Sequence, residues 1–169
     1  MRKKITIGII CVAVVALGVL IYNNVSIETE YTPEPEIEET EYRNTAISLY
    51  FQDKETKNMQ VETRLIDSKE LLKDPYVKLI SLLLEGPDNS NLESAIPVGT
   101  RLISVTQEGE TLVVNLSKEF LNFDTQETRV NAIYSIVNTI TELKEISKIK
   151  FMIEGEEAKG FNEPFARIK

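Results

Sequence analysis

The chain has 169 residues and a net charge of −8, and it contains no histidine, no tryptophan and a single cysteine, Cys11. Without histidine, and with no cysteine beyond residue 11, the sequence excludes Ser-His-Asp triads, Cys-His nucleophiles and ordinary zinc sites, which are the centres of most hydrolases. The acidic balance argues against binding nucleic acid and against lying on an anionic lipid surface.

Residues 5–22, ITIGIICVAVVALGVLIY, form an uncharged apolar run directly behind Arg2, Lys3 and Lys4. At about 1.5 Å per helical residue the run covers most of a roughly 30 Å hydrocarbon layer, so it predicts a transmembrane helix. The preceding basic residues predict that the N-terminus stays in the cytoplasm and that the rest of the chain lies outside. We therefore expect a single-pass protein of the cytoplasmic membrane, with residues 1–22 as cytoplasmic stub and anchor.

Cleavage or lipidation of this segment are the alternatives. A signal peptidase needs small residues after the apolar run, whereas residues 19–26, VLIYNNVS, offer bulky ones, which favours an uncleaved anchor. Lipidation at Cys11 is disfavoured because Ile10 stands where a lipoprotein signal usually has Gly, Ala or Ser. The apolar run also continues for eleven residues beyond the cysteine, as expected for a small apolar residue within a helix.

Residues 23–43 carry seven glutamates and one basic residue, Arg43, for a charge of −6. Because they include Pro33 and Pro35 and almost no adjacent apolar pairs, they cannot bury enough surface to offset the entropy of ordering. We expect a disordered acidic linker that spans roughly 25 to 65 Å. A recognition role for the acidic run is the alternative interpretation.

Residues 44–169 have the pattern of one globular domain, because 126 residues suffice for one core and are too few for two. The β-rich runs 46–51 and 61–66 predict two strands joined by a polar connection. Asp74 with Pro75 predicts the start of a helix, and Gly86 with Pro87 predicts its end. The deeply covered face of this helix should comprise Val77, Leu79, Ile80, Leu82, Leu83 and Leu84.

A turn-rich connection, residues 88–101, follows the first predicted helix and carries three apolar residues that predict an ordered course. We interpret it as a candidate interaction loop. The alternative is a helix end followed by a tight loop with a purely structural role. Its candidate contact residues are Asp88, Asn91, Pro97, Gly99 and Arg101.

A β-hairpin is predicted next, with strands at 102–106 and 112–116 and a turn at Glu108 and Gly109. In its first strand, alternation places Ile103 and Val105 on the apolar face. Residues 118–123 should then pack Phe120, Leu121 or Phe123 against the core.

A second helix is predicted from Asp124, where the side chains of Asp124 and Glu127 should each bind the other's free backbone amide. Its apolar face continues through about Leu143, and residues 149–153 form a final strand before a tail that folds back. The predicted class is α/β (α+β), a two-layer sandwich in which two helices cover one face of a mixed sheet of about five strands. The core-facing residues of the second helix should be Val130, Ile133, Tyr134, Val137, Ile140 and Thr141.

Five segments in order resemble the GerMN domain, the sporulation and spore germination domain. They are Leu49-Tyr50-Phe51, LLEGP at 83–87, SAIPVGT at 94–100, VVNLSKEF at 113–120 and YSIVNTITE at 134–142. The resemblance runs over nearly all of residues 46–155. It implies that residues 44–169 form a noncatalytic extracytoplasmic module of a bacterial envelope, which in the spore-forming example helps to assemble the complex joining mother cell and forespore.

Two departures from the family pattern affect what can be carried over. The family member resembles a lipoprotein with two such domains, whereas this sequence predicts one domain behind a transmembrane anchor. Gln52 also stands where the family often shows proline. The partner of the two-domain protein is therefore not transferred to this chain.

Three functions remain, and none calls for a cofactor or a metal. The first is an interaction module that supports a sporulation or germination complex of envelope proteins, and the second is a domain that binds peptidoglycan or another cell-wall ligand. The third is glycan hydrolysis, which needs two carboxylates about 5 to 10 Å apart in a cleft. The candidate carboxylates are Asp53, Glu85, Asp88 and Glu119. We expect no enzymatic activity.

Overall fold

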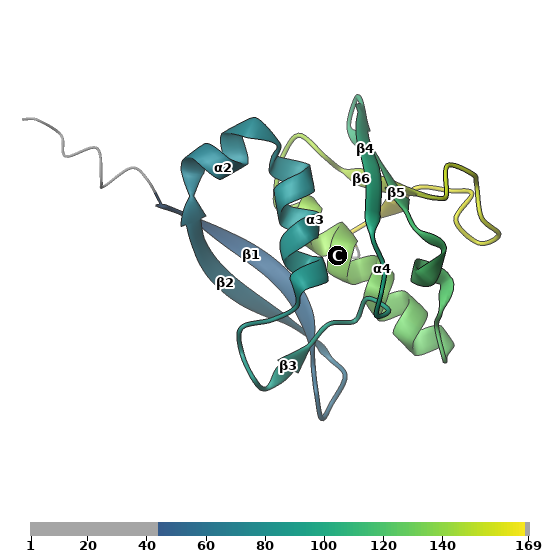
Figure 1. Ribbon diagram of the computed structural model, residues 1–169, viewed down its shortest axis with the longest axis horizontal. Helices are drawn as coiled ribbons and strands as arrows, with labels where there is room; N and C mark the ends of the chain where they lie inside the picture. Colours follow the sequence, from purple (N-terminus) through teal and green to yellow (C-terminus); the bar gives the residue numbers. More distant parts are fainter. Residues whose placement is uncertain (1–43, 168–169) are drawn as a thin grey trace, which may run out of the picture. The chain divides into compact units, whose positions relative to one another are not determined.

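The computed structural model describes residues 44–167, which form a domain with α and β structure (Figure 1). The predicted transmembrane helix at 5–22 and the predicted linker at 23–43 lie outside the described residues. In the described part of the chain, no helix combines the length and apolar character needed to cross a bilayer.

The first sheet is antiparallel and has the strand order β2-β1-β3. β1 (Asn44–Asp53) and β2 (Met59–Asp67) form a long hairpin, as predicted from their β-rich runs, and β3 (Leu92–Glu93) pairs with the end of β1. Alternate residues of β1 are buried, which gives the sheet one core face. The buried apolar residues of β1 are Ile47, Leu49 and Phe51.

Two helices follow the hairpin. The short α2 (Ser68–Lys73) was not predicted, and its N-cap is Asp67, whose side chain accepts a hydrogen bond from the backbone of Lys69. α3 (Pro75–Glu85) has the predicted bounds, with Pro75 at its start and Gly86 at its C-cap. Its covered face is Leu79, Ile80, Leu82 and Leu83, while Leu84 is partly buried. Val77 was predicted on this face but is 40% exposed, because it lies on the other side of the first turn.

The second sheet has the order β4-β5-β6-β7. β4 (Leu102–Glu108) and β5 (Thr111–Leu116) form the predicted hairpin, and β6 (Lys148–Ile153) pairs in parallel with β5. A short strand, β7 (Phe165–Ala166), pairs with β6 and confirms that the tail folds back.

A bulge in β4 overturns the predicted apolar face of that strand. The register with β5 shifts between Leu102 and Ser104, so one extra residue stands in β4 at Ile103. Leu102 and Val105 therefore pack against the core, while Ile103 is 48% exposed. The alternation of apolar and polar residues along the strand does not show where a bulge interrupts it.

A short 3₁₀ helix, η1 (Lys118–Leu121), leads to α4 (Gln126–Ile140) and fully buries Phe120, as predicted for this segment. The N-cap of α4 differs from the predicted one. Thr125 and Thr128 form the capping box, in place of Asp124 and Glu127, because each threonine hydroxyl bonds the other residue's backbone amide or carbonyl. Val130, predicted on the covered face, is 38% exposed, whereas Val137 is fully buried.

The two separate sheets replace the single mixed sheet that the sequence predicted. In Figure 1, α3 lies between β1 on one side and β4 on the other. α4 packs along β1, and its buried Ser135 and Thr139 hydrogen-bond to the backbone of Tyr50. Because α4 and the short β3 occupy this edge of β1, no strand of the second sheet can pair with it. One hydrophobic core nevertheless joins both sheets and the two longer helices.

Candidate functional site

The loops at one end of the first sheet form the candidate site, which we call the loop surface. It comprises the β1–β2 turn (54–58), the connection after α3 (86–101) and the segment before α4 (117–125). Each of the three is held by hydrogen bonds from its own polar side chains or from a neighbouring strand, so the surface has a defined shape.

Asp53 organises the β1–β2 turn. Its Oδ1 accepts hydrogen bonds from the backbone amides of Glu55 at 3.0 Å and Thr56 at 2.8 Å, and from the Thr56 hydroxyl at 3.0 Å. The amide of Thr56 contributes most, and together these donors hold the pKa of the Asp53 carboxyl below its ordinary value. Asp53 is therefore an ionised structural residue of the turn.

Glu62 and Arg64 of β2 fix the start of the connection after α3. The Glu62 carboxylate accepts the backbone amides of Asp88 at 3.2 Å and Asn89 at 2.9 Å. Arg64 Nη2 donates to the Gly86 carbonyl at 2.6 Å, and Arg64 Nε lies 3.1 Å from Asp88 Oδ2. Burial favours a raised pKa for Glu62, but the Asn89 and Asp88 amides and the Arg64 guanidinium outweigh it and hold the pKa below its ordinary value.

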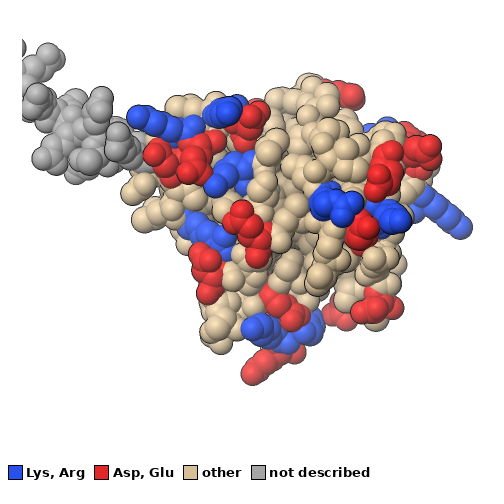
Figure 2. Space-filling model, viewed as in Figure 1, with Lys and Arg blue, Asp and Glu red and all other residues tan. Residues whose placement is uncertain are grey.

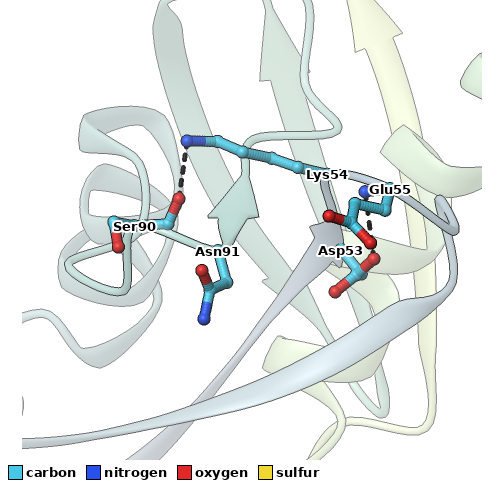
Figure 3. Close-up of a pocket in the computed structure, with 5 residues that line it drawn as sticks. All are labelled: Asp53, Lys54, Glu55, Ser90 and Asn91. Atoms are coloured by element: carbon cyan, nitrogen blue, oxygen red, sulfur yellow. Dashed lines mark hydrogen bonds between the residues drawn. The ribbon is translucent and has the colours of Figure 1, made fainter.

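A polar hollow of about 360 Å³ lies between the β1–β2 turn and the connection (Figure 3). The side chain of Lys54 reaches across it and donates to the Ser90 carbonyl at 2.7 Å. The Lys54 backbone amide donates to the Asn91 carbonyl at 3.0 Å. The hollow thus offers carboxylate, ammonium and amide groups to a polar ligand. Its lining residues are Asp53, Lys54, Glu55, Ser90 and Asn91.

Residues 97–100 form a tight turn at the far end of the connection. Both the backbone amide and the hydroxyl of Thr100 donate to the Pro97 carbonyl, at 3.2 and 2.6 Å. Gly99 has φ of 86°, which the third position of a type II turn requires and which favours glycine. The turn presents Val98 to solvent, with 97% of its surface exposed.

A second hollow, of about 380 Å³, lies beside this turn and is partly apolar. One wall is residues 94–98, and the facing wall is residues 122–124 together with Thr128 at the start of α4. Phe123 is held in the facing wall by an edge-on contact with the buried Phe120, at 5.4 Å between ring centroids. A partner that covers Val98 can therefore also reach into this hollow.

The structure places the five predicted contact residues at different points of the loop surface. Asp88 pairs with Arg64 and lines neither hollow, Asn91 lines the polar hollow, and Pro97 lines the second one. Gly99 shapes the turn. Arg101 leads into β4, where its backbone pairs with Ser117, and its Nη2 lies 3.9 Å from Glu119 Oε2.

Some residues that build the site from other elements were not predicted as site residues. Gln52 lines the second hollow, and its side chain donates to Glu93 at 2.7 Å and accepts from Asn131 at 3.0 Å. This is the position at which the sequence departs from the family's usual proline, and here a glutamine links β1, β3 and α4. Glu62 and Arg64 were also missed, although two opposite charges two residues apart in a strand indicate a shared face.

The described residues contain no group of three or more aspartates, glutamates, histidines or cysteines that could hold a metal ion. On the face in Figure 2, acidic and basic side chains alternate over the surface and do not gather into a field of one sign.

Residues 48–159 match the model of a protein family described as Germane, sporulation and spore germination. No curated protein matches the chain. Solved structures do match it, and one is a candidate lipoprotein from Clostridium perfringens, with 25% identity and a TM-score of 0.52 over 73% of this chain and 88% of that one.

Two further matching structures come from the sporulation protein GerM of Bacillus subtilis. Its first GerMN domain has 21% identity and a TM-score of 0.58, over 74% of this chain and 94% of that one. Its tandem GerMN domains have 19% identity and a TM-score of 0.60, over 75% of this chain and 45% of the tandem. At these identities the GerM structures establish the fold. Since the family model covers well over half of the sequence, the chain belongs to the Germane, or GerMN, family of sporulation and spore germination domains.

Proposed function

We propose that the domain is a noncatalytic binding module that holds a protein partner at the loop surface, within an envelope assembly of sporulation or germination. The observation that carries the proposal is the turn at residues 97–100, which is rigidly hydrogen-bonded and yet exposes 97% of Val98. An ordered turn loses little entropy on binding, so more of the contact energy is retained.

Burial of the exposed Val98 side chain would contribute free energy to a protein interface. Burying one valine side chain contributes at least about 1.5 kcal/mol, and the adjacent hollow gives a partner's apolar side chain a place beside Phe123. Arg101 follows the turn in sequence, and Asp124 lines the adjacent hollow, so both can supply a polar rim.

Two of the candidate carboxylates for hydrolysis, Asp53 and Glu119, favour a structural role. A glycosidase needs one carboxylic acid whose pKa is raised, so that it can donate a proton. Hydrogen bonds, chiefly from the Thr56 backbone to Asp53 and from the Ser117 side chain to Glu119, lower the pKa of both groups. Neither group is suited to act as the acid.

The polar hollow favours one second candidate, a ligand of the cell wall. Its carboxylates, the Lys54 ammonium and the Asn91 amide are groups that bind sugar hydroxyls and peptide amides. Purified peptidoglycan that retains the full chain at high salt, and loses it when Lys54 and Asn91 are replaced by alanine, supports this candidate over the first.

The envelope location is part of the proposal. The apolar run at 5–22 anchors the chain, and the domain lies outside the cytoplasm; the similarity to a candidate lipoprotein supports an envelope setting. A cysteine placed at exposed Thr106, in a chain with Cys11 replaced by serine, should react with a membrane-impermeant maleimide in intact cells. Labelling only after lysis contradicts this location.

The binding role is tested by comparing Val98→Asp with Leu72→Asp in the full chain in its native host. Val98 and Leu72 are both strongly exposed apolar residues, at 97% and 82%, so neither change should unfold the domain. After in-cell crosslinking, Leu72→Asp should still co-purify the protein found with the unaltered chain, and Val98→Asp should lose it. Equal recovery with both variants contradicts a partner site at the turn.

A further inference from the structure

The long strand β2 has one free edge. It is the outer strand in the order β2-β1-β3, and within residues 44–167 no strand pairs with its edge away from β1. In Figure 1, β2 borders the sheet on the side opposite α4. An edge strand of nine residues that no described strand pairs with is a template for adding another strand.

The hydrogen bonds of Tyr50 show which residues of β2 have outward-directed backbone groups. The amide and carbonyl of Tyr50 bind Thr139 and Ser135 of α4, so they point away from β2. Val61 lies opposite Tyr50, and in an antiparallel ladder both members of such a pair turn their backbone groups away from each other. Because this pattern repeats every second residue, Val61, Thr63 and Leu65 direct their amides and carbonyls to the free edge.

The same three residues carry exposed side chains. Val61 is 50% exposed, Leu65 is 70% exposed, and Thr63 between them is also exposed. Glu62 and Arg64 alternate with them and face the core side of the sheet, where they form the 2.6 Å ion pair that holds the connection after α3. The edge thus offers backbone pairing and an apolar strip at the same residues.

We propose that this edge is a self-association site, at which two copies of the chain pair through β2 strands that run antiparallel about a two-fold axis at Thr63. In this register Thr63 faces Thr63, and Val61 faces Leu65 of the second copy. All of these residues have outward-directed backbone groups, so the register satisfies the hydrogen-bonding requirement of a continuous sheet.

Charge complementarity favours this register over registers that are shifted by two residues. With Thr63 opposite Thr63, Glu62 of each copy lies opposite Arg64 of the other, which extends the existing ion pair across the interface. Sliding one strand by two residues places Glu62 against Glu62 or Arg64 against Arg64, and like charges in direct opposition are destabilising. A second copy of β2 suits this edge better than the acidic segment 23–43 of the same chain. That segment has a charge of −6, and β2 contains only one basic residue, Arg64, to pair with it.

The register is tested by disulfide formation in the full-length chain, with Cys11→Ser, in intact expressing cells. Paired residues on neighbouring strands have Cα atoms about 5.5 Å apart, within disulfide range, so Thr63→Cys should give a covalent dimer on mild oxidation. The matched control is Val61→Cys, which lies on the same exposed strip but about 13 Å from its symmetry mate. Thr63→Cys should dimerise about tenfold more than Val61→Cys, and Val61→Cys expressed together with Leu65→Cys should crosslink to each other. Equal yields from Thr63→Cys and Val61→Cys overturn the proposal.

A second variant separates pairing from folding. Proline at position 63 removes only the outward amide, so Thr63→Pro should leave the β1–β2 ladder intact and block the second copy. In the detergent-purified full chain, analytical ultracentrifugation should show self-association weakened by about tenfold or more. A dimer that persists in the folded Thr63→Pro variant overturns the proposal, and if that variant does not fold, the cysteine comparison decides.

Discussion

The hydroxyl of Ser135, in α4, donates a 2.6 Å hydrogen bond to the carbonyl oxygen of Tyr50, in β1. One turn further along the helix, Thr139 Oγ1 accepts the amide of the same residue at 3.0 Å. Two side chains of a helix thus replace the backbone of a neighbouring strand. Both side chains are buried, so they satisfy these two Tyr50 backbone groups on the covered side of β1. This arrangement ends the first sheet beside α4.

Replacing Thr139 with valine should therefore destabilise the domain. Valine keeps the shape of threonine but leaves the Tyr50 amide buried without an acceptor, which costs about 1–3 kcal/mol. Urea unfolding of the full chain measures the loss. Thr106→Val is the control, because Thr106 is exposed on β4 and should change stability by no more than about 0.5 kcal/mol. Equal stabilities of the two variants contradict the role of Thr139.

An aspartate on the covered face of α4 should be far more damaging than one on its exposed side. Val137 is fully buried, so Val137→Asp places an unpaired charge in the core and should cost several kcal/mol, on the order of 4 or more. Val130 is 38% exposed, and Val130→Asp should cost about 1 kcal/mol or less. Thermal melting compares them, and similar melting temperatures would show that the helix face is misassigned.

Acid should weaken the attachment of the connection after α3. The pKa of Glu62 is lowered in the folded state, so its contribution to stability is present above its ordinary pKa and is lost as the pH falls through the lowered value. Glu62→Gln should be less stable at pH 7 by about 1.5–3 kcal/mol and should lose less stability between pH 5 and pH 3 than the unaltered chain. Urea unfolding at each pH measures this. The same acid sensitivity in both proteins contradicts the prediction.

The turn that presents Val98 should depend on glycine at position 99. A Cβ there would lie 3.6 Å from Glu119 Cγ, an ordinary contact, so backbone strain at φ of 86° is the main cost. Gly99→Ala should destabilise the domain by about 1–2 kcal/mol, and Gly99→Asn by less, because asparagine tolerates left-handed conformations. Denaturant unfolding of the two variants should show this order, and the reverse order is inconsistent with the turn geometry.

The sequence was most informative where a local signal decides the structure. Asp74 with Pro75 and Gly86 with Pro87 bracket α3 at its observed bounds, because capping and chain termination act within a few residues. The N-cap of α4 was predicted one residue too early. Asp124 and Thr125 are both good N-cap residues, and the residue three positions later determines which of them forms a capping box. Thr128 satisfies Thr125 here.

The features that the sequence did not predict depend on contacts between distant segments. The division into two sheets follows from Ser135 and Thr139 meeting Tyr50, residues 85 and 89 positions away, which no local pattern reveals. The candidate loop was placed correctly as an ordered connection. The exposure of its individual residues was not predictable, because distant contacts set it. Arg64 and Glu62 hold one end of the connection, and the Pro97–Thr100 turn holds the other.

Site-specific photo-crosslinking tests the central claim, that the exposed turn at Val98 contacts a protein partner, most directly. A photoreactive amino acid is placed at position 98, or at position 72 as the control, in the full chain in its native host. The account predicts that position 98 gives a discrete crosslinked species containing one envelope protein, and that position 72 does not give it. The same pattern of products from both positions, or none from position 98 in a folded and correctly located chain, would contradict it.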